Sequence, residues 1–514
     1  MKKAAFLIIL FISIFSAELY AQLSVSVFSE YQMGNLPSFK PSNLTTLYNQ
    51  VNLEHRQDNT TIGLRYEEFQ SGLEERSYKH FSQRFVEWQK NAVKVRVGNF
   101  YSTLGRGLVM RAYELPNVVF EQRQFRRRYG YYRDIDGVLF EGTWKKFEIV
   151  AFRGSPLNNA FPPQLTNFNR RDGIVEGGQI VLRPKNWLMF GDAYSRITTS
   201  LKAQTEYNSI FSQISLNQVL RRAGLKRGSL KLYAEHARAN SHIDSFFSTA
   251  KEKPHATYLA LNFSAKRVGL SAEYKDYRNF ENGINLPPIV VMEHGYYLLN
   301  RSTHELLSNY EKGFQLEMTF RPTDDIFLLA NTSVATNSLP FDEFAFAEKF
   351  LDATFYLTPK LTAKAFYDWS KDEIKNEKNR NTGGVNLEWA FWRQYGLTVD
   401  FQHQAVERAF SSTLQENFKN TYLALAVSKS PLFSIGMAYD RSTDPVETDR
   451  PETPELYETK SKSWVSGVAS FQLNMSHEIS LFYGSRRGGL VCLSGTCFEV
   501  LPFEGLEIRW IGHF

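Results

Sequence analysis

The strongest constraint on the fold is an alternation of apolar and polar residues that runs along almost the whole chain. In one segment Phe314, Leu316, Met318 and Phe320 enclose polar residues at the positions between them. Side chains of a β-strand point alternately to opposite faces, so a period of two predicts strands with one apolar and one polar face. The same period recurs in residues 93–97, 361–369, 385–391 and 397–401. The chain is therefore predicted to be all-β.

The connections between these segments decide between a soluble sheet and a barrel, because a one-sided soluble sheet has the same local pattern. Short connections fall at residues 91, 145–146, 183–186, 321–324, 358–360, 392–394 and 429–431. Long connections fall at residues 102–133, 154–173, 239–253, 278–310, 442–460 and 487–503. Short periplasmic turns and long extracellular loops are typical of outer-membrane barrels. We predict a single large antiparallel transmembrane β-barrel over residues 22–514, with about 24 strands and a range of 20–26.

Composition agrees with a barrel and excludes a helical membrane protein. The chain has 41 Phe and 26 Tyr among 514 residues, yet its mean hydropathy is −0.36. In a barrel only every second residue faces lipid, so a chain rich in aromatic residues can still be polar on average. Tyrosine and tryptophan also suit the two membrane interfaces, where an apolar ring and a polar tip are both satisfied.

The N-terminus predicts the cell compartment. Lys2 and Lys3 precede an apolar run from Ala4 to Phe15, and Ala21 offers a small residue at a cleavage point. The run is shorter than a membrane-spanning helix requires, so residues 1–21 are interpreted as a cleaved signal peptide. We expect the chain to reach the cell outer membrane, where its partners would include membrane lipid and lipopolysaccharide.

The last strand carries a second targeting feature. Leu506, Ile508, Trp510 and Phe514 share one face of the predicted strand. A terminal aromatic residue on the lipid face resembles the insertion signal that the outer-membrane assembly machinery reads. Trp510 and Phe514 are therefore the predicted C-terminal insertion signal, and that machinery is an expected partner.

The connection at residues 102–133 is rich in arginine. Its candidate residues are Arg106, Arg111, Arg123, Arg126, Arg127 and Arg128. Guanidinium groups bind carboxylate and phosphate, so this connection would form an anion-selective constriction if it folded into the lumen. Charge runs are more often solvated. The alternatives are an exposed loop, or arginines paired with acidic residues of the barrel wall or with lipopolysaccharide phosphates.

The connection at residues 278–310 contains an apolar stretch at residues 286–291, followed by Glu293, His294 and Arg301. Apolar loop residues need burial, so we expect this segment to pack inside the barrel or against a partner. Glu293 and His294, with His304 and Glu305, include metal-ligand types, but their spacing is irregular. A structural plug is the favoured interpretation, and no metal is expected.

Two cysteines are present, Cys492 and Cys497, both in the last long connection. The exterior of the cell is oxidising, so a disulfide between them is expected. A zinc site would need two further ligands, and none is adjacent in sequence.

Catalytic signatures are absent from the sequence. It contains no Gly-x-Ser-x-Gly, no His-Glu-x-x-His and no phosphate-binding glycine loop. The formal net charge of +6 is mild and does not indicate nucleic-acid binding. We therefore expect neither enzymatic activity nor a cofactor, and no nucleic-acid partner.

Several motifs together resemble an uncharacterised outer-membrane barrel family of Bacteroidota. They are the Lys2-Lys3 start, residues 99–101, residues 105–108, the segment from Pro287-Pro288 to Tyr296-Tyr297-Leu298, and the terminal strand. This resemblance implies an outer-membrane location and no assigned activity, so it assigns no functional residues. TonB-dependent transporters carry an N-terminal plug domain of well over a hundred residues, whereas the strand pattern here starts at Leu23. This difference argues against active, TonB-coupled uptake.

Two functions remain open. The first is a porin-like channel or transporter for small polar or anionic solutes, with a lumen too wide to fill with wall side chains alone. Its predicted inward charges are Lys94, Arg96, Glu317, Lys364, Asp368 and Glu388. The second is a non-enzymatic structural subunit of an outer-membrane secretion or assembly complex, with loops that bind an envelope protein.

The terminal strand gives a first testable prediction. Replacing Phe514 with Lys removes the aromatic residue of the insertion signal and places a charge on the lipid face. We expect the variant to remain in the periplasm and to be degraded, as measured by surface labelling and immunoblotting of membrane fractions. Surface levels equal to those of the unmodified protein would contradict the proposed topology.

Overall fold

The computed structural model describes residues 23–36, 44–122, 126–158, 170–199, 203–225, 227–240, 254–304, 310–339, 342–410, 415–448 and 461–514. The predicted signal peptide at residues 1–21 lies outside the described residues. No helix among the described residues is both long enough and apolar enough to cross a membrane.

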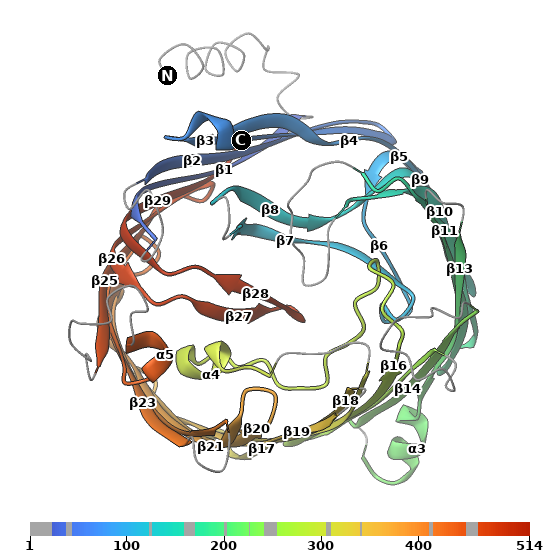
Figure 1. Ribbon diagram of the computed structural model, residues 1–514. Coiled ribbons are helices and arrows are strands. Elements are labelled where there is room, and N and C mark those ends of the chain that lie inside the picture. The colour runs from blue at the N-terminus through green and yellow to red at the C-terminus, as the bar shows by residue number, and fades with distance from the viewer. Residues whose placement is uncertain are drawn as a thin grey trace.

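The described chain forms one closed ring of 24 antiparallel strands, seen end-on in Figure 1. The strands of the first half are β1 (Leu23–Asn35), β2 (Leu44–Gln57), β3 (Thr60–Ser71), β4 (Tyr78–Lys90), β5 (Val93–Phe100), β9 (Ile135–Trp144), β10 (Phe147–Pro156), β11 (Ile174–Lys185), β12 (Leu188–Thr198), β13 (Gln204–Ser215), β14 (Ser229–Ala239) and β15 (His255–Ala265). Those of the second half are β16 (Val268–Arg278), β17 (Tyr310–Thr323), β18 (Ile326–Leu339), β19 (Asp342–Thr358), β20 (Leu361–Asp372), β21 (Glu377–Trp392), β22 (Tyr395–Ala409), β23 (Gln415–Lys429), β24 (Phe433–Ser442), β25 (Lys462–Asn474), β26 (His477–Arg486) and β29 (Phe503–His513).

The ring closes where the first strand meets the last. β1 pairs with β29 from Ser26 opposite His513 to Asn35 opposite Glu504. The backbone of Phe514 extends this ladder, because its N–H donates to the carbonyl of Val25 at 2.9 Å and its own carbonyl accepts from Val25. The predicted fold class and strand number are confirmed. Closure leaves no free sheet edge, which is the condition for strands to exist within a membrane.

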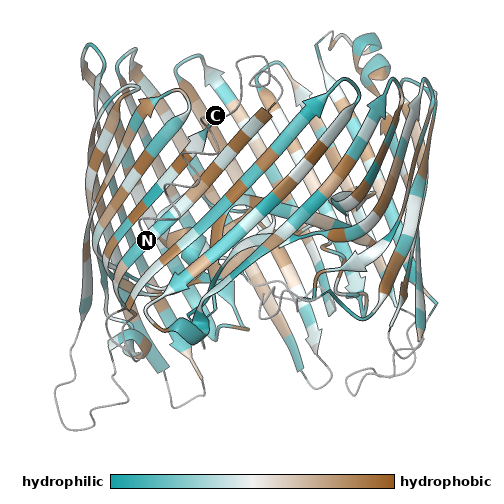
Figure 2. Ribbon diagram, turned by 90° about the horizontal axis from the view of Figure 1, so that it is seen from above, coloured by the Kyte–Doolittle hydropathy of each residue, from teal (hydrophilic) through white to brown (hydrophobic). Residues whose placement is uncertain are grey.

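The alternation in the sequence becomes an apolar outside and a mixed inside. In β20 the even-numbered Phe366 and Asp368 are buried toward the interior, whereas Tyr367 is exposed on the outer surface. Figure 2 shows hydrophobic residues recurring along the strands of the wall. Among the inward charges, Lys364 of β20 and Glu388 of β21 pair at 2.7 Å.

One rim of the outer surface carries exposed aromatic side chains. They are Trp88, Trp144, Trp187 and Trp392, each near a tight turn between two strands. Phe514 is also exposed, and its ring meets that of Trp510 edge-on at 6.3 Å. Aromatic girdles of this kind mark the membrane interface of transmembrane barrels.

The turns beside these aromatic residues all lie at one end of the barrel, here called the short-turn end. The strands run further into these turns than the sequence suggested, because β11 includes Pro184 and β17 includes Pro322. The pairing register slips beside each proline, between Leu182 and Lys185 and between Phe320 and Thr323. Proline has no N–H to donate to the ladder, so it is tolerated where pairing ends. The β13–β14 connection is longer and carries the helix α3 (Asn217–Arg222).

The opposite end carries the long connections, three of which contribute segments inside the ring (Figure 1). The first contains β6 (Ser102–Leu104), β7 (Met110–Glu121) and β8 (Arg128–Arg133). The second precedes β17 and contains α4 (Tyr297–Arg301), and the third is the hairpin of β27 (Gly489–Leu493) and β28 (Thr496–Val500). Two short helices lie in other long connections, η1 (Glu74–Arg76) and α5 (Pro445–Thr448).

The outward face gives a prediction with a control on the same strand. Leu351 in the middle of β19 and Leu357 near its end face outward and are similarly exposed, at 59% and 58%. Arginine on the lipid face costs ~2–4 kcal/mol at the bilayer midplane and ~0–1 kcal/mol near the interface. We expect Leu351→Arg to destabilise the folded barrel by that larger amount and Leu357→Arg by the smaller. Urea titration in lipid vesicles, followed by gel mobility of the folded form, measures both. Equal losses of stability in the two variants would show that the bilayer midplane does not lie at Leu351.

Candidate functional site

The candidate functional site is the set of three inward segments, here called the plug. It consists of the β7–β8 arm (residues 102–122 and 126–133), the α4 arm (residues 279–304) and the β27–β28 hairpin (residues 489–500). All three lie within the ring of strands in Figure 1. A 24-stranded ring is too wide for wall side chains alone to fill, so added chain is needed to close it.

The plug shares an apolar core with the barrel wall. Leu104, Leu108, Val109 and Met110 of the β7–β8 arm are completely buried. They belong to one hydrophobic cluster with wall residues of β10 to β16 and with Phe280, Ile284 and Val290 of the α4 arm. Burying a large aliphatic side chain contributes ~1.5–3 kcal/mol. The plug is therefore packed against this side of the wall like the interior of a soluble domain.

The tip of the β7–β8 arm is built by two glycines. Gly105 and Gly107 have φ values of +53° and +89°, which other residues rarely adopt. A Cβ on Gly105 would lie 2.4 Å from a carboxylate oxygen of Glu235 on β14. That carboxylate accepts a hydrogen bond from the backbone N–H of Arg106 at 2.9 Å. The side chain of Gln179 on β11 accepts another from Gly105. Glycine thus lets the tip approach the wall closely and fixes where Arg106 lies.

Arg106 lies at a polar cavity of about 500 Å³ between the plug and the wall. The other lining residues come from β13 to β17: Gln213, Ser229, Lys231, Tyr233, Asn262, Phe263, Ser264, Gly269, Leu270, Ser271, Glu317 and Thr319. The Arg106 guanidinium lies 5.1 Å from the centre of the Tyr233 ring. It makes no ion pair with any described residue, and the same holds for Lys231. Among the predicted arginines, Arg106 is the one that faces this cavity.

The arginines further along the arm form ion pairs instead of a constriction. Arg128 pairs with Glu30 of β1 at 2.8 Å, and both side chains are only 2% exposed. Glu121 lies 3.4 Å from Arg128 and 3.5 Å from Arg126. Arg127 donates to the backbone carbonyl of Glu75 at 2.9 Å. Arg123 lies outside the described residues. Arg126 and Arg128 therefore follow the alternative in which the arginines pair with acidic groups, one of which, Glu30, belongs to the barrel wall.

The α4 arm is held to the opposite wall by aromatic stacking and hydrogen bonds. Tyr296 stacks on Phe366 with ring centres 3.7 Å apart, and Tyr297 stacks on Tyr422 at 4.1 Å. The Tyr297 hydroxyl donates to Asp440 at 3.1 Å. Burial raises the pKa of Tyr297 to about 12, so the hydroxyl keeps its proton at neutral pH. Burial also lowers the pKa of Arg301, which donates to the carbonyl of Arg487.

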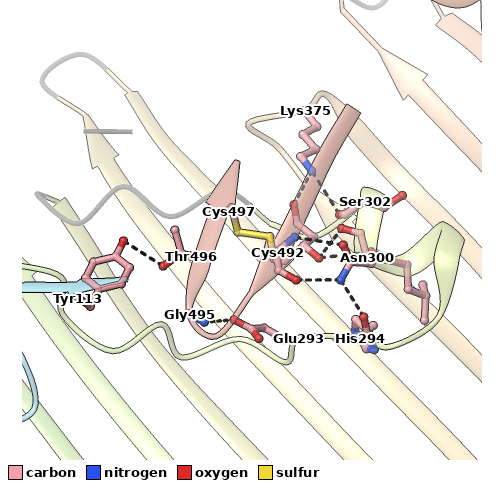
Figure 3. The surroundings of a disulfide bond; sticks show 12 residues. Tyr113, Glu293, His294, Asn300, Ser302, Lys375, Cys492, Gly495, Thr496 and Cys497 are labelled. Carbon is pink, nitrogen blue, oxygen red and sulfur yellow. Dashed lines mark hydrogen bonds between the residues drawn. A yellow bond between two sulfur atoms is a disulfide. The ribbon is translucent and has the colours of Figure 1, made fainter. Parts of the chain in front are cut away.

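The β27–β28 hairpin joins the other two plug segments, as Figure 3 shows. Its Cys492 and Cys497 form a disulfide. Thr496 donates a hydrogen bond to the Tyr113 hydroxyl of the β7–β8 arm at 3.1 Å. Asn300 of the α4 arm donates to the Cys492 carbonyl and accepts from the Cys492 N–H, both at 3.1 Å. The hairpin therefore couples two segments that lie far apart in sequence.

Two of the predicted polar residues contribute to this junction. The carboxylate of Glu293 accepts a hydrogen bond from the N–H of Gly495 at the hairpin tip. Arg111 donates to the carbonyl of Ser494 at 3.3 Å. Both residues therefore act here as links between plug segments.

The histidines of the α4 arm contact different carboxylates. His304 lies 2.8 Å from Asp372 of β20, through Nδ1. His294 Nε2 lies 3.2 Å from Glu348 of β19. His294, Glu348 and Asp368 form the one group of potential metal ligands found in the described part of the chain. Glu305 lies outside the described residues. Sequence spacing groups His294 only with its neighbours on the arm. From the sequence Asp368 is predicted only as an inward charge, and Glu348 is not singled out.

The model of a family described as "Family of unknown function (DUF6029)" matches residues 1–514. The chain belongs to this family. No curated protein matches the DUF6029 chain in sequence.

Solved structures similar to this DUF6029 chain are outer-membrane proteins of several kinds. OccK5 (OpdH) of Pseudomonas aeruginosa has 10% identity and a TM-score of 0.40, over 71% of this chain and 96% of that one. The siderophore receptor PirA of Pseudomonas aeruginosa has 10% identity and a TM-score of 0.44, over 96% and 80%. The P pilus usher PapC has 9% identity and a TM-score of 0.42, over 96% and 99%. At these values no function is carried over from them.

Sequence reasoning missed the wall residues that hold the plug. Glu30, Gln402 and Asp440 occupy inward positions of β1, β22 and β24 and accept bonds from Arg128, the N–H of Leu298 and Tyr297 respectively. The alternation indicates that such residues face inward. It carries no information on which plug residue each will meet, because the partners are separated by 98, 104 and 143 positions.

The Arg128–Glu30 pair gives a test of how firmly the plug is held. Removing one partner of a buried ion pair costs ~3–5 kcal/mol. In Arg128→Met the Glu30 carboxylate keeps its ion pair with Arg509, 2.5 Å away. We therefore expect the variant to lose about 3 kcal/mol of stability, the lower limit of that range. Arg111→Met loses an exposed hydrogen bond to the Ser494 carbonyl and should lower the stability by under about 1 kcal/mol. Denaturant unfolding monitored by Trp fluorescence and limited proteolysis measures both, and similar losses would show that the pair does not anchor the plug.

Proposed function

We propose that the protein is an outer-membrane channel for small polar solutes whose lumen is closed by the plug in this conformation. The observation that carries the proposal is the polar cavity beneath the plug tip, lined by Arg106 and by inward residues of five strands. Its volume of about 500 Å³ is in the range of sites that bind small molecules. A barrel without a transport role would not require a polar cavity directly beneath the segment that closes its lumen.

The charges of the cavity favour anionic solutes. Arg106 and Lys231 contribute two positive charges and Glu317 one negative charge. Neither cation has an ion-pair partner within 4 Å among the described residues, although the carboxylates of Glu235 and Glu273 lie close enough to Arg106 to interact with its charge. Both cations therefore remain available for direct contact with a carboxylate or phosphate group. Arg106 is held in place by its backbone contact with Glu235, and its side chain can therefore act as a fixed binding group.

The location is proposed from the outer surface of the barrel. A closed ring with exposed apolar residues and an aromatic rim is stable in a bilayer, whereas such an apolar belt would be unfavourable in water. On this proposal the long connections face outward, the short-turn end faces the periplasm, and lipid and lipopolysaccharide surround the wall. Insertion would use the last strand and the outer-membrane assembly machinery.

Transport requires the plug to move, which can be tested by shortening it. We expect replacement of residues 489–500 by a short Gly-Ser linker to unlink the two arms and to raise single-channel conductance several-fold in planar bilayers. The unmodified protein should conduct weakly under the same conditions. A variant that replaces the α3 connection, residues 216–228, by a similar linker serves as the control, since it lies outside the lumen. No current from any form would overturn the channel proposal.

Solute selectivity depends on Arg106. Replacing Arg106 with Gln removes a fixed positive charge from the cavity, so the preference for anions over cations should fall. Reversal potentials in a salt gradient, recorded on the hairpin-deleted form, measure this preference. Arg441→Gln is the control, because Arg441 follows the inward Asp440 on β24 and therefore faces the outer surface, away from the lumen. An unchanged reversal potential for Arg106→Gln would contradict a role for this cavity.

A second candidate function is a structural subunit of an outer-membrane secretion or assembly complex. The continuous apolar core between plug and wall favours it, since a plug packed in this way resists displacement. On this reading a partner protein binds the long connections. Purification from native membrane should then yield a stoichiometric companion, and hairpin deletion should produce no channel current.

A further inference from the structure

Three potential ligands from separate parts of the chain meet at the contact between the α4 arm and the wall. They are His294 of the arm, Glu348 of β19 and Asp368 of β20. One ligand atom from each lies within 4.8 Å of the other two. All three residues are buried, with exposed fractions of 3%, 3% and 0%. The group is fixed in place, because the His294 ring packs on Phe350 and its carbonyl accepts a bond from Asn300.

The polar atoms of this group are poorly satisfied. Among the described residues no group meets hydrogen-bond geometry with either carboxylate oxygen of Asp368 or with Nδ1 of His294, and the Ser370 hydroxyl interacts with Asp368 without meeting that geometry. The Arg380 guanidinium is nearby, but Nε lies 3.9 Å from Asp368 and Nη2 lies 3.7 Å from Glu348. Both distances are too long for hydrogen bonds. A buried carboxylate without partners is costly, so its presence calls for a further ligand.

The charges around Arg380 point to what that ligand is. Glu348, Asp368 and Glu377 all lie within 4 Å of its guanidinium. Three carboxylates around one guanidinium leave an excess of two negative charges when His294 is neutral. Asp372 does not change this balance, because the positive charge of Lys375 nearby offsets it. One divalent cation would neutralise the excess.

We propose that His294, Glu348 and Asp368 bind a divalent transition-metal ion, with Zn²⁺ as the best match. One imidazole nitrogen and two carboxylates are a ligand set that zinc accepts, with a fourth position left for water. Ca²⁺ and Mg²⁺ are disfavoured because they select oxygen ligands only. The ion would bridge the α4 arm and two wall strands, and would hold the plug in its closed position.

The test uses the full mature chain refolded into detergent micelles after treatment with a chelator. Isothermal titration with ZnCl₂ should give one Zn²⁺ per chain. Asp368→Asn and His294→Gln should each weaken binding by about 100-fold or more, since even partners outside the ligand shell contribute 10- to 100-fold. His403→Gln is the control, because His403 contacts Thr421 on the exposed wall, away from the proposed site. The His403→Gln variant should bind zinc as tightly as the unmodified protein. Gel mobility of the unheated protein verifies that each variant is folded.

A measurement on the unmodified protein keeps the test decisive if the variants do not fold. Protein loaded with Co²⁺ should show visible absorption typical of a four-coordinate nitrogen and oxygen site, and X-ray absorption of the zinc form should show one imidazole ligand. Absence of stoichiometric metal would overturn the proposal, and would leave protons on the buried carboxylates as the source of charge balance. Zinc affinity unchanged in folded Asp368→Asn would overturn it as well.

Discussion

The backbone hydrogen bonds of the wall are the constraint from which the rest of the structure follows. A strand in a bilayer has no water to satisfy its N–H and C=O groups, so every strand needs two neighbours. The ladder between β1 and β29 meets this requirement for the first and last strands. Once the ring is closed, one face of each strand must suit lipid and the other must suit the lumen. This accounts for the alternation along the entire wall.

Closure with 24 strands creates a second requirement, because the lumen is wider than wall side chains can fill. The plug meets it in two different ways. On the β10–β16 side the contact is a shared apolar core that includes Leu108 and Val109. On the other side small apolar clusters, such as Leu299 with Phe350 and Phe366, are combined with stacked rings, buried ion pairs and hydrogen bonds, such as Tyr297 with Asp440.

The hairpin with its disulfide occupies the centre of this arrangement. It bonds to Tyr113 on one arm and to Asn300 on the other, so neither arm can leave the lumen alone without losing a partner (Figure 3). The proposed metal ion would add a link between His294 and the wall close to the same junction. Transport and structural roles make opposite demands on these links, since a channel must release them and a structural subunit must keep them.

The sequence by itself determined the wall. Strand identity, the direction each residue faces and the number of strands all follow from a local period of two, which needs no knowledge of distant residues. The same reasoning placed the aromatic residues and predicted where the long connections fall. The plug contacts were decided by tertiary structure, because Arg128 could meet any inward carboxylate until the arm was placed beside β1. The grouping of His294 with Glu348 and Asp368 was decided in the same way: its members are brought together by packing of an arm on two strands, which sequence spacing does not encode.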